Sequence, residues 1–271
     1  MPAREAQRML QTGLLDILQS FCRDDPGRSA TFHGYVPAIE SISVRGGVAR
    51  PAASVMKVPL LMTVYRDAAA GRIDLDRSVA VESFSKTRYV SILAGFDAGR
   101  KLSLREVSRL AVITSDNPLA VHLQSLVDFA GVNRLLEEIG CGPPCRMAAG
   151  FSEDELGPRN RVNVLTTDAC IRIWTALKDD PIYRDLMVAL KNNLRNQRIP
   201  ALLPDEVAVF HKTGSLDGVV NDVGILQDDR VCFALAFLTD GQADPLQTTN
   251  EIAACSLAMY ELVARNSRES G

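Results

Sequence analysis

The sequence predicts an α+β fold: one antiparallel five-stranded sheet, flanked by N-terminal and C-terminal helices, with an inserted all-helical lobe. Two observations predict it. β-prone runs gather near both ends of the chain, and the stretch between them has helical periodicity closed by capping residues and glycines. We therefore expect a sheet lobe formed by residues 1–50 and 201–271 and a helical lobe formed by residues 51–200. A ligand site is expected at the seam between the lobes.

Local patterns predict each element in turn. Apolar residues at helical spacing predict an amphipathic helix over residues 3–22, followed by strands over 30–36 and 40–45. The helices predicted for the middle of the chain cover residues 55–70, 103–114, 118–129, 132–139, 167–177 and 181–194. The remaining strands are predicted over residues 207–212, 219–227 and 231–239, and the last helix over 245–264.

The composition is that of an ordinary globular protein. Of the 271 residues, 46% are apolar and 23% are charged, and the formal net charge is −3. These values argue against a disordered chain, and the lack of a clustered basic segment argues against a nucleic-acid partner. The histidines, His33, His122 and His211, are scattered, so we expect no metal site and no cofactor. The sequence predicts no particular oligomeric state.

The N-terminal segment lacks the pattern of an export signal. Gln11, Thr12 and Asp16 interrupt its apolar residues, and no stretch of the chain is apolar for the length of a membrane span. As written, the sequence predicts a cytoplasmic protein with no membrane partner. A mis-assigned start codon or a removed leader would instead make it an exported protein.

Six cysteines are present, and without an export signal we expect them to be reduced thiols. Cys141 and Cys145, in Cys-Gly-Pro-Pro-Cys, are candidates for a metal or redox pair. A stiff loop is the favoured interpretation, because no second Cys or His pair lies nearby to complete a tetrahedral site.

Ser54-Val55-Met56-Lys57 is the first of three motifs that indicate a chemistry. If Ser54 caps the helix that follows, Lys57 lies one turn above its hydroxyl on the same face. A buried lysine loses affinity for its proton and can then act as the base for a serine nucleophile. The motif alone is weak. Helix capping would also explain Ser54, and a similar string at residues 83–86 lacks a following apolar helix.

Ser115-Asp116-Asn117 is the second motif, placed between two predicted helices. The hydroxyl of Ser115 can relay a proton, and the side-chain amide of Asn117 can hold a substrate carbonyl. Asp116 is assigned a structural role in the loop. Helix capping is the alternative for all three residues.

Lys212-Thr213-Gly214 is the third motif, at the end of a predicted strand. Lys212 and Thr213 can bind a substrate carboxylate, and Gly214 permits close approach of a ligand. The backbone amide of Ser215 can join that of Ser54 in an oxyanion hole. The alternative is an exposed strand end followed by a turn.

The order and spacing of the three motifs resemble those of class A β-lactamases and related penicillin-binding serine hydrolases. Ser115 follows Ser54 by 61 positions (115 − 54), and Lys212 follows Ser115 by 97 (212 − 115). The resemblance covers about residues 30 to 265. It implies that an activated amide or ester acylates Ser54, that Lys57 takes the hydroxyl proton and that Ser115 passes it to the leaving nitrogen.

The resemblance also implies that Arg198 binds the substrate carboxylate. Arg198 begins the segment Arg-Ile-Pro-Ala-Leu-Leu-Pro, and the strand after the third motif, which reads Val-Val-Asn-Asp, has no arginine for that role. A solvated arginine is the alternative.

One departure from the family concerns deacylation. The loop string Glu-x-x-Leu-Asn is absent between the second and third motifs. Glu153 and Glu155 are the nearest candidates for a deacylation base, but neither stands at the required distance from Asn160, and plain surface acidity is the favoured explanation. Without a base that activates water, the acyl-enzyme would persist.

Three functions remain open at this point. The favoured one is a serine hydrolase acylated by a β-lactam or a related amide or ester and then hydrolysed. The second is a slow-turnover penicillin-binding protein, a D-alanyl peptidase relative or a β-lactam sensor, and the third is a non-catalytic scaffold. The partner in the first two is a small-molecule acyl donor, whose identity the fold does not determine.

Overall fold

Five antiparallel strands form the central sheet of the computed structural model, which describes residues 3–152 and 161–269. Across the sheet the order is β2 (Ala38–Val44), β1 (Arg28–Val36), β9 (Cys232–Thr239), β8 (Val219–Gln227) and β7 (Ala208–Leu216). The two ends of the chain meet where β1 pairs with β9. The predicted fold class is therefore confirmed.

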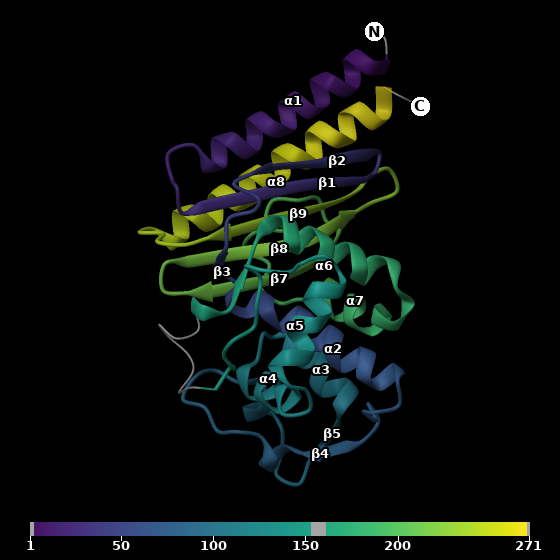
Figure 1. The fold of residues 1–271 in the computed structure, drawn as a ribbon, viewed down its shortest axis with the longest axis vertical. Helices are drawn as coiled ribbons and strands as arrows, with labels where there is room; N and C mark the ends of the chain where they lie inside the picture. Colours follow the sequence, from purple (N-terminus) through teal and green to yellow (C-terminus); the bar gives the residue numbers. More distant parts are fainter. Residues whose placement is uncertain (1–2, 153–160, 270–271) are drawn as a thin grey trace.

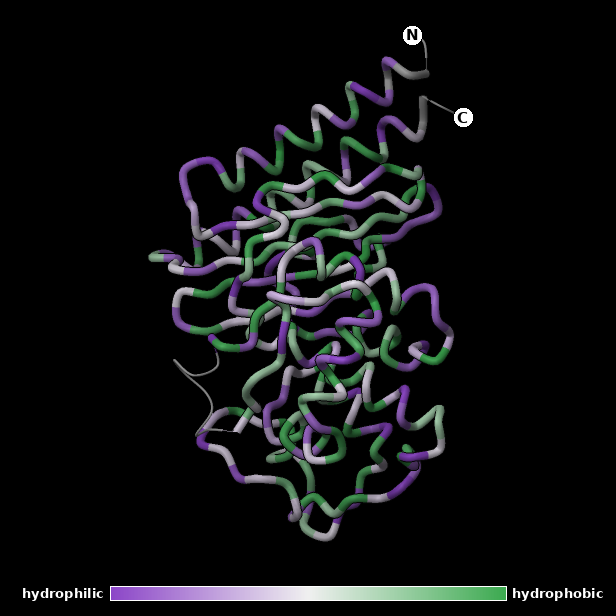
Figure 2. The backbone as a smooth tube through the Cα atoms, viewed as in Figure 1, coloured by the Kyte–Doolittle hydropathy of each residue, from purple (hydrophilic) through white to green (hydrophobic). Residues whose placement is uncertain are grey.

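Two helices cover one face of the sheet. α1 (Ala3–Cys22) and α8 (Pro245–Glu269) lie side by side along it, as Figure 1 shows. The backbone of α1 alternates between hydrophobic and hydrophilic colouring in Figure 2, because its apolar stripe faces the sheet and its charged residues face solvent. Leu14 and Leu18 in that stripe are fully buried, in a core shared with β1, β9 and α8.

The helical part of the chain packs against the other face. α6 (Thr167–Asp179) is the helix nearest the sheet in Figure 1, and its Trp174 is fully buried and donates a hydrogen bond of 2.9 Å to the carbonyl of Phe210 on β7. The other helices of this part are α2 (Lys57–Ala69), α3 (Leu104–Ile113), α4 (Asn117–Gln124), α5 (Phe129–Glu138) and α7 (Arg184–Lys191). The 3₁₀ turns are η1 (Ala53–Met56), η2 (Val81–Ser83), η3 (Ile92–Gly95) and η6 (Pro181–Tyr183).

Four short strands complete the described elements. β3 (Arg50–Pro51) pairs with β6 (Val164–Leu165), and β4 (Ser78–Ala80) pairs with β5 (Lys101–Ser103). The first pair ties the chain just before η1 to the chain just before α6. The boundaries proposed for the two lobes, at residues 50 and 200, remain predictions.

Several helix boundaries differ from the predicted ones. The helix expected over residues 118–129 ends at Gln124, because the side chain of Asp128 accepts a hydrogen bond from the Gly131 amide and starts α5 there. The helix expected over residues 181–194 begins as η6, and α7 ends at Lys191. α8 runs five residues past the predicted end at residue 264.

The strand that carries the third motif is longer than predicted. β7 continues to Leu216, because its pairing with β8 holds in register to the partner pair of Leu216 and Val219. Lys212, Thr213 and Gly214 therefore lie inside a paired strand and not at its end.

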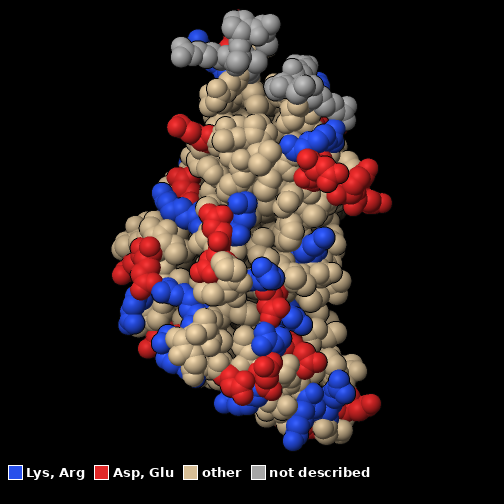
Figure 3. Space-filling model, turned by 90° about the vertical axis from the view of Figure 1, so that its right-hand side faces the viewer, with Lys and Arg blue, Asp and Glu red and all other residues tan. Residues whose placement is uncertain are grey.

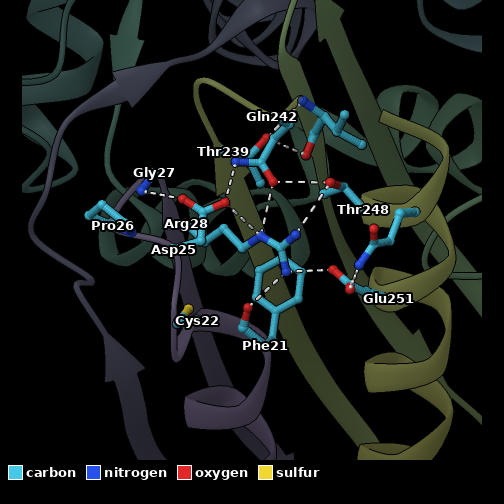
Figure 4. Close-up of polar contacts among 12 residues, drawn as sticks. Phe21, Cys22, Asp25, Pro26, Gly27, Arg28, Thr239, Gln242, Thr248 and Glu251 are labelled. Atoms are coloured by element: carbon cyan, nitrogen blue, oxygen red, sulfur yellow. Dashed lines mark hydrogen bonds and ion pairs between the residues drawn. The ribbon is translucent and has the colours of Figure 1, made fainter. Parts of the chain in front are cut away.

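An arginine network joins the beginning and the end of the fold (Figure 4). The guanidinium of Arg28 donates to Gln242 Oε1 at 2.9 Å and to the Phe21 carbonyl at 3.0 Å, and it pairs with Glu251 at 2.5 Å. Its side chain is only 14% exposed. The first residue of β1 thus contacts the end of α1, the connection between β9 and α8, and α8 itself.

The surface carries charges of both signs. On the face shown in Figure 3, Lys and Arg side chains alternate with Asp and Glu side chains. None of the helices in the described part of the chain combines the length and the apolarity that crossing a bilayer requires. Residues 3–152 and 161–269 also contain no cluster of three or more His, Cys, Asp or Glu side chains arranged to hold a metal ion.

Candidate active site

Ser54 does not cap a helix, contrary to the prediction. It lies inside the 3₁₀ turn η1, and α2 begins at Lys57 without a side-chain cap. Ala53, immediately before it, has a φ of 49°, a left-handed conformation that costs a non-glycine residue about 1–2 kcal/mol. The Ser54 hydroxyl is partly exposed and forms no hydrogen bond with the described residues. The turn therefore leaves this hydroxyl free to react.

Backbone and side-chain contacts hold the segment just before Ser54 in place. The amide of Ala52 donates to the carbonyl of Asn163 at 2.8 Å. The side chain of Asn221 on β8 donates to the carbonyls of Pro51 at 2.7 Å and of Ala52 at 3.3 Å. This segment is thus held between β8 of the sheet and Asn163, which explains how the left-handed residue is maintained.

Lys57 is fully buried, and its amine points at the second motif. Nζ donates to the carbonyl of Ser115 at 2.6 Å, to that of Asp116 at 3.2 Å and to Oδ1 of Asn117 at 2.7 Å. Burial lowers the pKa of Lys57 to about 7; the charge of Asp116 opposes this shift, and that of Arg195 adds to it. The amine therefore loses its proton far more readily than that of a solvent-exposed lysine.

The direct hydrogen bond that we expected between Lys57 and Ser54 is not formed. The reason lies in the three oxygens of the 115–117 turn, which together accept all three protons of the charged amine. When the amine loses a proton, one of these contacts is given up and a lone pair becomes available. The longest contact is the one to the Asp116 carbonyl.

Ser115 joins the two buried lysines of the site. Its carbonyl accepts from Lys57, and its Oγ accepts from Nζ of Lys212 at 2.8 Å. Lys212 is also fully buried and donates to the Thr213 carbonyl at 2.8 Å. Burial, and then the charge of Lys57, hold the pKa of Lys212 well below its usual value. Ser115 has a φ of 61°, so it is a left-handed residue of the site, as Ala53 is.

Asp116 has the structural role predicted for it. Its carboxylate accepts the Leu119 amide at 3.1 Å, which caps α4, and the Ile92 amide at 2.9 Å, which anchors η3. Asn117 presents Oδ1 to Lys57, so its Nδ2 remains for a ligand.

Arg198 contacts the third motif, and its predicted role in binding a carboxylate stays a prediction. Nη1 donates to the carbonyl of Gly214 at 2.9 Å and to that of Asn221, and Nη2 donates to Oγ of Ser215 at 2.6 Å. The guanidinium is mostly buried, and burial lowers its pKa. Thr213 lies on the same strand and is 4% exposed. A carboxylate bound here would meet a guanidinium fork, two hydroxyls and the Lys212 ammonium.

Gly214 lets the sheet approach the turn that carries Ser54. A Cβ at this position would lie 2.7 Å from the carbonyl oxygen of Ala52 and 3.1 Å from Cβ of Ala53. Only glycine therefore fits, and the close approach brings the backbone of Ser215 toward that of Ser54. The oxyanion role of the two amides remains a proposal.

Some functional residues are absent from the sequence prediction. The ring of Phe151 lies 5.2 Å from Nζ of Lys57, and the charge of Arg195 lowers the pKa of Lys57 and Lys212. Neither belongs to a recognisable motif, so no sequence signal identifies them. Glu153 and Glu155, the predicted candidates for a deacylation base, lie outside the described residues.

The cysteine pair forms part of the core. The thiol of Cys141 donates to the carbonyl of Ala169 at 3.4 Å, and that of Cys145 to Oγ1 of Thr166 at 3.8 Å. Burial raises the pKa of Cys141 to about 12, so its reactive thiolate is suppressed. All six thiols are free and buried.

Replacement of Gly214 by alanine is expected to disable the site. The added Cβ would overlap the Ala52 carbonyl and push the Ser54 turn away from β7. We expect a loss of about 1–3 kcal/mol in the free energy of unfolding and at least a tenfold loss of Ser54 reactivity. Chemical denaturation and labelling by an acyl donor measure the two effects. Gly47→Ala is the control, since no atom lies within 4 Å of its added Cβ. Full reactivity in Gly214→Ala would contradict the close approach.

The chain is similar to known proteins over most of its length. The model of the beta-lactamase enzyme family matches residues 15–263, whereas a search of curated proteins finds no match. A β-lactamase from Sphaerobacter thermophilus is 22% identical, with a TM-score of 0.82 over 94% of this chain and 97% of that one. A class A β-lactamase from Bacteroides cellulosilyticus is 20% identical, with a TM-score of 0.83 over 94% and 99%. A point mutant of PBP-A, solved as an acyl-enzyme complex with penicillin G, is 18% identical, with a TM-score of 0.78 over 94% and 96%. The chain belongs to the beta-lactamase enzyme family.

Proposed function

We propose that this protein is a serine hydrolase that a β-lactam or a related amide or ester acylates at Ser54. One observation carries the proposal. A free serine hydroxyl lies one turn from a fully buried lysine whose pKa is about 7, and Ser115 links that lysine to a second buried lysine. The PBP-A complex, in which a protein of the same fold is an acyl-enzyme with penicillin G, supports the choice of acyl donor.

The proposed acylation begins with a proton transfer from the Ser54 hydroxyl to the neutral amine of Lys57. Oγ attacks the carbonyl carbon, and the backbone amides of Ser54 and Ser215 stabilise the oxyanion. When the carbon–nitrogen bond breaks, Ser115 donates its proton to the leaving nitrogen, and Lys57 returns a proton to Ser115. Lys212 donates to Oγ of Ser115, so the proton of that hydroxyl can point toward the substrate.

The hydrogen-bond donors of the site that take no part in the proposed proton transfers can bind the substrate. Nδ2 of Asn117 can donate to the carbonyl of the acyl side chain, because its Oδ1 is occupied by Lys57. Arg198, Lys212 and Thr213 form a cationic and hydroxyl-lined position for a carboxylate, with Gly214 allowing the ligand to approach the strand.

A slow-turnover penicillin-binding protein or β-lactam sensor is the second candidate function. The observation that favours it is the ring of Phe151, which lies against the Lys57 amine and excludes water from that side of the base. The ring is 1% exposed. Glu153 and Glu155 are the candidates for a carboxylate that activates water, and without such a base the acyl-enzyme persists.

Penicillin G is expected to add its full mass to the protein at Ser54. Intact-mass spectrometry should show the adduct in the wild-type protein and in Ser83→Ala, which alters the similar serine–lysine string. The adduct should be absent from Ser54→Ala. An unlabelled wild-type protein, tested with penicillins and activated esters, would contradict acylation and favour the non-catalytic scaffold.

The rate of acylation is expected to rise with pH through about 7. Below this value Lys57 is protonated and cannot accept the Ser54 proton, so the rate should fall about tenfold per pH unit; above it the rate should level off. Stopped-flow labelling with an uncharged ester isolates this effect from binding of an anionic substrate. Circular dichroism over the same range serves as the folding control. A rate constant that does not change between pH 5 and 9 would exclude Lys57 as the base.

The lifetime of the acyl-enzyme decides between the two candidate functions. The placement of Phe151 leads us to expect a penicillin adduct that survives removal of free penicillin for minutes or longer. Intact mass measured over time gives the deacylation rate. Rapid turnover of nitrocefin would reject slow turnover, and slower deacylation in Glu153→Gln or Glu155→Gln would then identify the base.

A further inference from the structure

A buried histidine–aspartate pair lies directly behind the third motif. His211 precedes Lys212 on β7, and its Nδ1 lies 2.9 Å from Oδ1 and 3.1 Å from Oδ2 of Asp222 on β8. The two side chains are 1% and 0% exposed. Gly224 faces His211 across the sheet, and a Cβ at Gly224 would lie only 2.6 Å from that of His211. Because Gly224 has no side chain, β8 leaves room for the side chain of His211.

The pair holds the segment around Arg198 at two points. Nε2 of His211 lies 3.0 Å from Oδ1 of Asn196, and Oδ2 of Asp222 accepts the amide of Ile199 at 3.0 Å. Each ring nitrogen of His211 thus faces one hydrogen-bonding partner, Asp222 at Nδ1 and Asn196 at Nε2. Arg198 lies between the two anchored residues.

The anchoring sets the direction in which Arg198 points. From this segment its guanidinium crosses to β7 and β8, where it contacts the carbonyls of Gly214 and Asn221 and the hydroxyl of Ser215. Burial lowers the pKa of Arg198, and the charge of Asp222 opposes that shift. The same carboxylate therefore supports Arg198 through the backbone and through its charge.

We propose that His211 and Asp222 are positioning residues that orient Arg198 for the carboxylate-binding role already proposed for it, so that the pair supports the selection of acyl donors bearing a carboxylate beside the scissile amide. The inference rests on the proposed function, because the selection is expressed as acylation of Ser54. A guanidinium binds a carboxylate best when two parallel N–H groups face it, so a small rotation of the fork weakens binding. Acyl donors without a carboxylate do not depend on the orientation of the guanidinium.

Penicillin G and its methyl ester are the matched probes, since they differ only at the carboxylate, which the ester neutralises and extends by one methyl group. Replacement of His211 by leucine should lower the second-order rate constant for acylation by penicillin G by about 10- to 100-fold, the loss typical of a charged hydrogen bond. The rate constant for the methyl ester should change less than about threefold, because the ester offers no carboxylate for Arg198 to bind. His211→Asn, which keeps a donor for Asp222, should recover part of the loss. His33→Leu, at a partly buried histidine on β1, is the control.

A double-mutant cycle shows whether the effect passes through Arg198. Arg198→Gln should reproduce the selectivity of His211→Leu, and the double variant should lose little more than either single one. Equal losses with both probes, or fully additive losses, would overturn the proposal and leave His211 as a core residue. If the leucine variant does not fold, His211→Asn carries the cycle.

A measurement that needs no acylation separates this proposal from the proposed function. In a crystal structure of His211→Asn or His211→Leu, the guanidinium of Arg198 should leave the carbonyls of Gly214 and Asn221. An unchanged guanidinium would overturn the positioning role even if Ser54 reacts. A displaced guanidinium in a protein that no acyl donor labels would uphold the positioning role and reject the proposed function.

Discussion

The burial of two lysine ammonium groups around one serine is the constraint on which the rest of the site depends. Lys57 and Lys212 come from a helix and a strand far apart in the sequence, and Ser115 contacts both, through its carbonyl and its hydroxyl. Burial lowers the pKa of both amines, the charge of Arg195 lowers that of Lys57 further, and the charge of Lys57 lowers that of Lys212 further. Burying the two amines costs free energy of folding. It also yields a Lys57 amine that can be neutral near pH 7.

The surroundings of the two lysines reduce that cost without removing it. Backbone carbonyls and the Asn117 side chain satisfy the Lys57 amine, and the buried carboxylates of Asp116 and Asp222 oppose the loss of protons from Lys57 and Lys212. Both carboxylates are also occupied with backbone amides, of Leu119 and Ile92 in one case and of Ile199 in the other. Each thus orders a loop of the site as well as balancing charge.

The sheet fixes the position of the backbone before Ser54, whereas the buried lysines supply the amines proposed to move protons. β7 comes within contact distance of the turn before Ser54, and Asn221 on β8 binds the same turn through two carbonyls. Two residues of the site are left-handed, Ala53, which precedes Ser54, and Ser115. Strain at such positions persists only where neighbours hold the backbone, and at Ala53 the sheet and Asn163 hold the segment just before it.

The sequence by itself determined the fold class, the approximate extent of most elements and the residues of the three motifs. Periodicity and capping are local, and they survive in the structure because the tertiary contacts agree with them, as in α1 and in the Ser103 capping box of α3. The order and spacing of the three motifs resemble those of a known family, and the folded chain brings Ser115 within hydrogen-bonding distance of both Lys57 and Lys212. Arg198 was identified in the same way, by resemblance.

Only the tertiary structure decided which contacts these residues make. It put Ser54 inside a 3₁₀ turn, directed the Lys57 amine to the 115–117 turn, and extended β7 through the third motif by pairing with β8. It also brought Phe151, Arg195 and the His211–Asp222 pair to the site. These contacts join positions that are distant in the chain, and their energies depend on burial and on neighbouring charges. Neither quantity is present in a linear pattern of residue types.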